Sequence, residues 1–108
     1  MADAFEERKK THEDKWAHDE ELRFKINARR NKLLGMWAAA ELGLSGPAAE
    51  DYAKAVVAAD FEGADHVFRK IRRDFDAAKR GHSDHLIQRQ MADLLTVAAD
   101  QVMHEKKS

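Results

Sequence analysis

The sequence reads Gly43-Leu44-Ser45-Gly46-Pro47 at the point where one helical pattern stops and the next begins. Glycine readily adopts the left-handed backbone conformation that ends many helices, so Gly43 is predicted to end the first helix. Ser45 can then cap the second helix, and Pro47 falls in its first turn, where a missing N–H loses no hydrogen bond. This stretch predicts two helices joined by a short turn.

Two more glycines divide the rest of the chain in the same way. Gly63 is followed by Asp65 as a predicted cap, and Gly81 is followed by Ser83. Between these stops, apolar residues recur three and four positions apart, which is the spacing of a helix with one buried face. We predict helices over residues 19–42, 46–62, 65–80 and 83–105.

Each predicted helix carries its own apolar face. In chain order the four faces consist of Leu22, Ile26, Leu33, Trp37 and Ala40; Tyr52, Val56 and Ala59; Phe68, Ile71, Phe75 and Ala78; and Ile87, Met91, Leu94, Leu95, Ala98 and Val102. Four amphipathic helices with short connections predict an all-α fold, a four-helix bundle over residues 19–105. The side chains expected to be largely buried are Trp37, Ile71, Phe75, Leu94 and Leu95. We expect the chain to fray from residue 104, with residues 106–108 as a tail.

Residues 1–18 are left over as an arm, either a fifth helix or an extension of the first. The arm is rich in helix formers and in charges of both signs, but it has few apolar residues. Phe5, His12 and Trp16 lie on one narrow stripe of a helix. Because so short a helix is marginal in water, we expect a helical or partly disordered arm. Its stripe would either enter a groove on a partner or fold back and extend the bundle's core.

Composition excludes several classes of protein. The 108 residues fit one domain, and the net charge of −1 lacks the basic excess of a small nucleic-acid binder, so no nucleic-acid partner is expected. The absence of cysteine rules out disulfides and thiolate metal sites. No apolar run approaches the ~18 residues of a membrane span, and the N-terminus lacks a signal-peptide core. We therefore expect a cytoplasmic protein that does not insert directly into a membrane.

Several blocks of the sequence resemble a known family. The most specific block is Arg29-Arg30-Asn31-Lys32-Leu33-Leu34-Gly35, because amphipathicity alone does not demand its order. The other blocks are Asp19-Glu20-Glu21-Leu22-Arg23-Phe24-Lys25, Tyr52-Ala53-Lys54, Asp60-Phe61-Glu62, Val67-Phe68-Arg69-Lys70, Ser83-Asp84-His85 and Met91-Ala92-Asp93-Leu94-Leu95. Together they cover essentially the whole chain and resemble the alphaproteobacterial zeta subunit, the ATPase inhibitor subunit of the ATP synthase.

The resemblance implies a small four-helix bundle with a mobile N-terminal inhibitory arm and no enzymatic activity of its own. In that family the arm wedges into a catalytic interface of the enzyme's soluble head and blocks ATP hydrolysis. The protein would be peripheral to the inner membrane when bound to the ATP synthase and a monomer when free. The residues then expected to bind the partner are Phe5, Arg8, Lys9, His12, Trp16, Glu20 and Glu21.

A short basic cluster is a second candidate site. Arg29, Arg30 and Lys32 could contact a nucleotide phosphate or an acidic partner patch. No glycine-rich phosphate loop accompanies them, so we favour an exposed helix face that includes Asn31. We expect no cofactor, with weak ATP or ADP binding left open. A nucleotide-sensing or purely structural helical bundle without inhibitory activity is therefore the alternative function.

Two other features invite an interpretation. His82 and His85 are three positions apart with Asp84 between them, but no HExxH pattern or second paired cluster accompanies them. We expect surface or capping roles and no metal. Gly35 lies inside a predicted helix, where glycine is unfavourable by about 1 kcal/mol relative to alanine. Its presence predicts close helix packing at that point.

Overall fold

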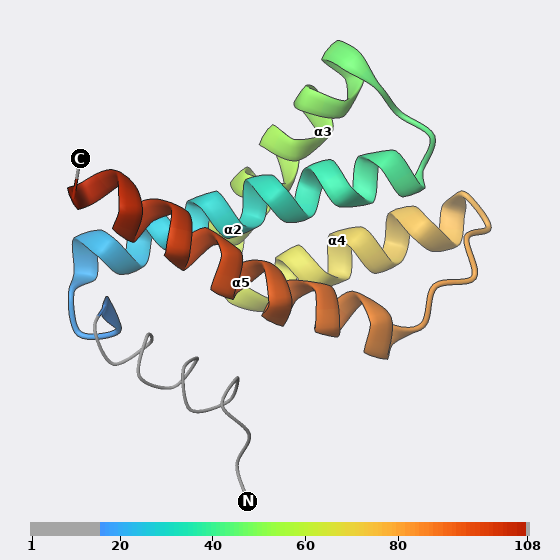
Figure 1. Cartoon of the computed structure of the whole chain (residues 1–108). Helices are drawn as coiled ribbons and strands as arrows, with labels where there is room; N and C mark the ends of the chain where they lie inside the picture. The colour runs from blue at the N-terminus through green and yellow to red at the C-terminus, as the bar shows by residue number, and fades with distance from the viewer. Residues whose placement is uncertain (1–15, 108) are drawn as a thin grey trace, which may run out of the picture.

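The computed structural model describes residues 16–107, and four α-helices account for most of this part of the chain (Figure 1). With the labels of Figure 1, they are α2 (Glu20–Glu41), α3 (Gly46–Ala59), α4 (Ala64–Ala77) and α5 (Asp84–Lys107). A single 3₁₀ turn, η1 (Asp60–Glu62), continues α3. No strand occurs among the described residues. The predicted all-α fold with four helices is confirmed.

The turn between α2 and α3 forms as its sequence predicts. Gly43 has a φ of +82°, and its N–H bonds to the carbonyl of Ala40 at 3.0 Å. The N–H of Leu44 bonds to the carbonyl of Ala39 at 2.8 Å, which completes the hydrogen-bond pattern of a glycine-terminated helix. Ser45 occupies the cap position of α3 with extended backbone, although its side chain makes no capping hydrogen bond. Backbone geometry, more than the serine hydroxyl, therefore starts α3.

Two of the predicted helix boundaries are wrong. Gly63 itself is the cap residue of α4, and Asp65 lies inside the first turn, where it pairs with Arg69 at 2.9 Å. At the other end, α4 stops at Ala77 because Lys79 takes the left-handed conformation, with a φ of +57°. The helix therefore ends before Gly81. Ser83 caps α5 as predicted, since its Oγ accepts a hydrogen bond from the N–H of Leu86 at 3.1 Å.

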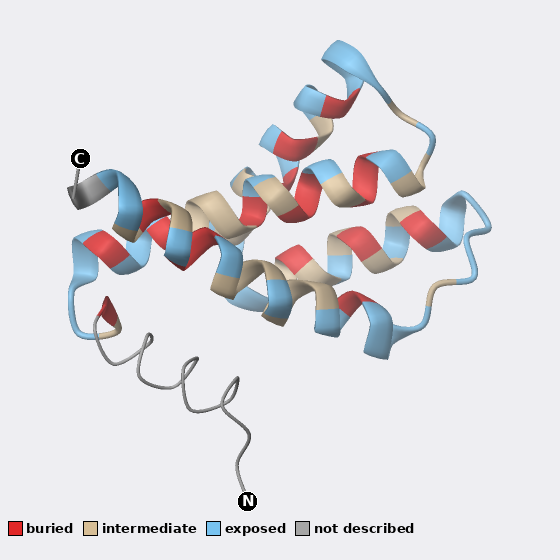
Figure 2. Cartoon of the chain, in the orientation of Figure 1, coloured by how far each residue is buried: buried red, intermediate tan, exposed pale blue. Residues whose placement is uncertain are grey.

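The core consists of two clusters that share α2. The first cluster contains residues of all four helices, namely Leu34, Ala38, Val56, Val67, Ile71, Phe75 and Ile87. The second lies between the beginning of α2 and the end of α5 and contains Trp16, Leu22, Ile26, Ala98, Ala99 and Val102. In Figure 2 the buried positions accordingly follow α2 along its length. Helix α2 is therefore the central element, with α3 and α5 as its main partners.

Gly35 lies at a close approach of α2 and α3. A Cβ atom at this position would be 2.6 Å from the Cα of Ala53 and 3.2 Å from the Cβ of Val56. Such distances are far inside van der Waals contact, so a larger residue would push the helices apart. The predicted close packing at Gly35 is confirmed.

The predicted core is correct in part. Ile71 and Phe75 are fully buried, whereas Trp37, Leu94 and Leu95 are only partly buried at the edges of the two clusters. Ala40 and Ala78 are exposed, contrary to prediction. A single apolar stripe was expected on α2. Because α3 and α5 pack on different sides of this helix, residues outside the stripe are also buried. These residues are Asn31, Leu34, Ala38 and Ala39.

The C-terminal helix extends further than expected. Fraying was predicted from residue 104 with a tail at 106–108, but α5 continues to Lys107. Val102 and Met103 pack into the second cluster, and the carboxylate of Glu105 lies 2.8 Å from Arg29 of α2. These contacts with α2 hold the last turns of α5 in the helical conformation.

Candidate functional site

Trp16 is buried against the bundle. Its side chain is 6% exposed and lies in the second core cluster, which also contains Ala98, Ala99 and Val102 of α5. The stripe of the arm was expected either to enter a groove on a partner or to extend the core of the bundle. In the structure, Trp16 extends the core. The packing of the bundle thus begins before the expected boundary at residue 19. The other predicted arm contacts, Phe5, Arg8, Lys9 and His12, lie outside the described residues.

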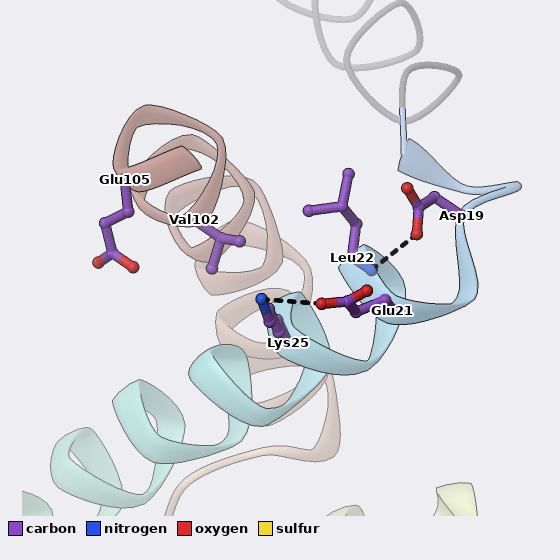
Figure 3. A pocket seen from close by; sticks show the side chains of 6 residues that line it. All are labelled: Asp19, Glu21, Leu22, Lys25, Val102 and Glu105. Carbon is purple, nitrogen blue, oxygen red and sulfur yellow. Dashed lines mark hydrogen bonds and ion pairs between the residues drawn. The ribbon is translucent and has the colours of Figure 1, made fainter. Parts of the chain in front are cut away.

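A tight turn connects Trp16 to α2. The N–H of Asp19 bonds to the carbonyl of Trp16 at 3.0 Å, and Asp19 Oδ1 accepts a hydrogen bond from the N–H of Leu22 at 3.1 Å (Figure 3). Asp19 therefore caps α2. Glu20 and Glu21 follow in the first turn and are exposed. Their negative charges interact favourably with the positive end of the helix dipole. Glu21 also pairs with Lys25 at 3.2 Å.

A shallow cavity opens beside this turn, between α2 and the end of α5 (Figure 3). It measures about 260 Å³ and is lined by Asp19, Glu21, Leu22, Lys25, Val102 and Glu105. Three carboxylates and one ammonium group line it, so its lining carries a net negative charge that disfavours an anionic ligand. Its volume is also below the roughly 300–1,000 Å³ of most small-ligand sites.

The basic cluster does not converge on one site. Arg29 Nη1 donates to Gln101 Oε1 at 2.9 Å, and its guanidinium also pairs with Glu105 at 2.8 Å. The hydrogen bond that Arg29 donates to Glu105 lowers the pKa of the Glu105 carboxyl. Arg29 thus links α2 to α5.

Arg30 and Asn31 point elsewhere. Arg30 Nε donates to Asn31 Oδ1 at 2.7 Å, and burial lowers the pKa of the Arg30 guanidinium, against the opposing charge of Asp60. Asn31 is fully buried. The expectation that Asn31 belongs to an exposed face is therefore wrong, because α3 covers the side of α2 on which it lies.

Lys32 alone of the three basic residues is exposed on a groove. This groove lies between α2 and α3, has a volume of about 480 Å³ and is lined by Lys32, Met36, Glu50, Ala53, Lys54 and Val57. It is larger and more apolar than the cavity beside Asp19. Neither Arg29 nor Arg30 lines it.

The two histidines singled out from the sequence have different surroundings. His82 Nε2 lies 3.2 Å from Glu41 Oε2, and its ring lies 4.6 Å from the ring of Phe75 between centroids. His85 is exposed on α5. Within residues 16–107, no three histidine or acidic side chains gather as a metal site would require. In the same range, no helix combines the length and apolarity needed to cross a bilayer.

Sequence reasoning missed an exposed aromatic pair. Phe24 on α2 and Phe61 in η1 are both largely in solvent, and their ring centroids are 6.4 Å apart. Neither residue belongs to a predicted apolar face. A signal was nevertheless present, because a large aromatic residue off the buried stripe of an amphipathic helix has no core to enter.

Comparison with known proteins gives one assignment. A search of curated proteins found no match. The sequence model of the family described as ATPase inhibitor subunit zeta matches residues 1–101, which include both the arm and nearly all of the bundle. With so much of the chain matched, the protein belongs to the ATPase inhibitor subunit zeta family.

Proposed function

We propose that this protein inhibits ATP hydrolysis by inserting its N-terminal arm into a catalytic interface of the soluble head of the ATP synthase. The observation that carries the proposal is the family match, which begins at residue 1 and therefore includes the arm. An inhibitor subunit needs a binding element and no catalytic centre of its own. The protein would act as a regulatory partner of the enzyme and not as an enzyme.

The position of Trp16 changes which residues are expected to enter the partner. Since Trp16 is part of the second core cluster, the segment available for insertion is residues 1–15, and Trp16 anchors its end to the bundle. Of the stripe formed by Phe5, His12 and Trp16, Phe5 and His12 then remain to contact the partner, with Arg8 and Lys9 beside them. Glu20 and Glu21, exposed at the start of α2, are suitably placed to contact the partner next to the point of insertion.

The decisive experiment removes the arm and leaves the core intact. ATP hydrolysis by the catalytic head from the same organism would be measured with the full chain and with a chain lacking residues 1–15. The full chain should inhibit, and the shortened chain should not, although its melting temperature stays unchanged because Trp16 is retained. Equal inhibition by both chains would assign the activity to the bundle and refute insertion of the arm.

Kinetics with single variants can test the insertion itself. If Phe5 is buried in the partner, Phe5→Ala should raise the dissociation rate far more than Lys9→Ala, because burying a large aromatic surface outweighs an exposed charge. Lys9→Ala should mainly change the association rate and its dependence on salt. Similar dissociation rates for the two variants would argue against an inserted aromatic residue.

A second candidate function, nucleotide sensing, is favoured by the groove at Lys32. Its volume of about 480 Å³ suits a small ligand, and Lys32 and Lys54 line it with two positive charges beside one carboxylate, that of Glu50. Calorimetric titration with ADP and ATP tests this directly. Binding that is lost in Lys54→Ala and kept in Arg69→Ala, a matched change outside the groove, would support it. Absence of heat at millimolar nucleotide would dismiss it.

A further inference from the structure

The turn before α2 interrupts a stretch of sequence whose local preferences allow one continuous helix. Asp19 has extended backbone, with a φ of −100° and a ψ of 106°, and Ala17 and His18 form the turn that precedes it. No glycine or proline lies between Trp16 and Gly35, and alanine, the residue at position 17, is the best helix former. Because the local sequence does not impose this break in the helix, other contacts must hold it.

A capping side chain and a buried ring hold the break. Asp19 Oδ1 accepts a hydrogen bond from the N–H of Leu22 at 3.1 Å (Figure 3), which a cap residue makes only in its non-helical conformation. The N–H of Asp19 in turn bonds to the carbonyl of Trp16 at 3.0 Å. The ring of Trp16 is 6% exposed and belongs to the second core cluster.

The break and the burial of Trp16 depend on each other. On a helix continued backwards from α2, Trp16 would share the side of Glu20 and Arg23, which follow it by four and seven residues and are both exposed. Leu22 and Ile26, which belong to the second cluster, would lie about 80–120° away around the helix axis. A continuous helix would therefore turn the indole out of the core.

The buried position of Trp16 is not fully satisfied. Its Nε1 is buried, and no acceptor within residues 16–107 lies at hydrogen-bond distance. A buried donor without a partner is unfavourable, so the ring would gain a hydrogen bond on leaving the core. The joined helix would add backbone hydrogen bonds at the former turn. In the free chain the apolar area of the buried ring outweighs these gains, but they narrow the difference between the two arrangements.

We propose that residues 16–19 form a two-state latch at the root of the arm. In the closed state Trp16 lies in the core and Asp19 breaks the helix. In the open state residues 16–19 continue α2 as one helix, and Trp16 lies on its outer side. The closed state leaves residues 1–15 for the partner, and opening adds Trp16 to them, on the helical stripe that its spacing shares with Phe5 and His12. The use of the open state in binding rests on the proposed function, whereas the latch is a property of the free chain.

The first test uses the free chain with Trp37→Phe, in which Trp16 is the only tryptophan. Asp19→Ala removes the cap, whereas the matched control Asp19→Asn removes the charge and keeps a capping side chain. Asp19→Ala should raise the quenching of Trp16 fluorescence by acrylamide about twofold and move the Cα chemical shifts of residues 17–19 to helical values, because one transition produces both changes. Asp19→Asn should behave as its parent chain.

The two measurements must change together. Stronger quenching without helical chemical shifts would mean that the turn frays, and helical chemical shifts with unchanged quenching would mean that the ring stays in the core without the break. Either result would overturn the latch. An Asp19→Ala variant that matches its parent chain in both measurements would overturn it as well.

The second test measures the dissociation constant of the full chain on the immobilised catalytic head. If the head binds the open state, the population of the closed state weakens binding, so Asp19→Ala should lower Kd about fivefold and Asp19→Asn should leave it unchanged. An equal Kd for Asp19→Ala and the unaltered chain would refute the use of the open state while inhibition by the arm stands. Binding without inhibition would refute the proposed function, and the Kd values would still decide the role of the latch. An unaltered chain that does not bind would refute both of these roles.

Discussion

The two halves of α2 are held by cores of different construction. The second half packs into the first cluster, to which all four helices contribute and in which every member is fully buried. The first half packs into the second cluster, which depends on α5 and on Trp16, a residue that precedes α2. Trp16, Leu22 and Val102 retain slight exposure there. The end of the molecule that carries the arm is therefore the more weakly enclosed one.

The same contrast holds for the polar links at the edges of the clusters. In the first cluster, Tyr52 of α3 donates a hydrogen bond to Asp74 of α4 at 2.8 Å, and both residues are partly buried. In the second, Arg29 of α2 reaches Glu105, which is exposed, at 2.8 Å. Exposed ion pairs contribute little because water and salt screen them. Loosening at the root of the arm should therefore leave the four-helix core in place.

The largest effect should follow from emptying the first cluster. Phe75→Ala removes a fully buried ring that contacts Trp37 and His82, and it should lower the free energy of unfolding by about 3–5 kcal/mol. Denaturant unfolding followed by circular dichroism would measure this loss. Leu94→Ala, at a partly buried position, serves as the control and should cost less. Equal losses would show that the edge of the cluster matters as much as its centre.

Trp16→Ala should have the next largest effect, about 2–4 kcal/mol. The loss is smaller than for Phe75 because a cluster at the end of the molecule can collapse more easily around the missing ring. Hydrogen exchange should show the loss of protection confined to the beginning of α2 and the end of α5.

Trp16→Phe is the matched control for this site. It should recover most of the stability, since no acceptor within residues 16–107 lies at hydrogen-bond distance from the buried Trp16 Nε1. If Trp16→Ala left both stability and exchange unchanged, the second cluster would not depend on Trp16 and the contrast between the two cores would disappear.

The Tyr52–Asp74 hydrogen bond should make the stability of the protein depend on pH in the alkaline range. Burial and the neighbouring carboxylate raise the pKa of Tyr52 above its ordinary value of 10.0. Because the folded state holds this proton more tightly, the stabilisation is complete below pH 10 and is lost as the pH rises towards the raised pKa. Tyr52→Phe should cost about 1 kcal/mol at neutral pH and weaken this alkaline dependence.

Tyr52 is the only tyrosine of the chain, so the ultraviolet absorbance of tyrosinate reports on this residue alone. A titration curve of the folded protein centred at pH 10 would mean that the hydrogen bond does not form in solution.

The smallest expected effect concerns the end of α4. Lys79 has a φ of +57°, a conformation that glycine adopts without strain. Lys79→Gly should raise the free energy of unfolding by about 0.5–1 kcal/mol, because relief of the strain exceeds the added freedom of the unfolded chain. Lys54→Gly, inside α3, should do the opposite. A lower free energy of unfolding for Lys79→Gly would show that the side chain of Lys79 stabilises the fold by more than the backbone strain costs.

The helical framework could be predicted from the sequence because its signals are local. The conformational freedom of Gly43, the cap at Ser83 and the spacing of the apolar residues act over one or two turns, and each was interpreted correctly. The error at the end of α4 has the same origin. A glycine at 81 predicted the stop, but the hydrogen bonds of the last turn, such as that from the N–H of Arg80 to the carbonyl of Phe75 at 2.8 Å, formed around Lys79 instead.

The candidate site was predictable only in part. The sequence placed Trp16 on a stripe of the arm, but a groove on a partner and a groove on the bundle would bury the same ring. The α5 residues that share its cluster lie more than eighty residues along the chain. Phe24 was overlooked because its exposure depends on where α3 stops covering α2. Arg29, Arg30 and Lys32 look like one cluster in the sequence and point in three directions on a helix.

The sequence by itself therefore determined the helices, their approximate ends and the family of the protein. Only the tertiary structure decided that α2 is enclosed on two sides, so that Asn31 is buried while Ala40 is exposed, and that Trp16 belongs to the core. The physical reason is one of range. Backbone preference and helical periodicity depend on residues a few positions apart, whereas burial depends on which distant helix arrives at a given face and where that helix ends.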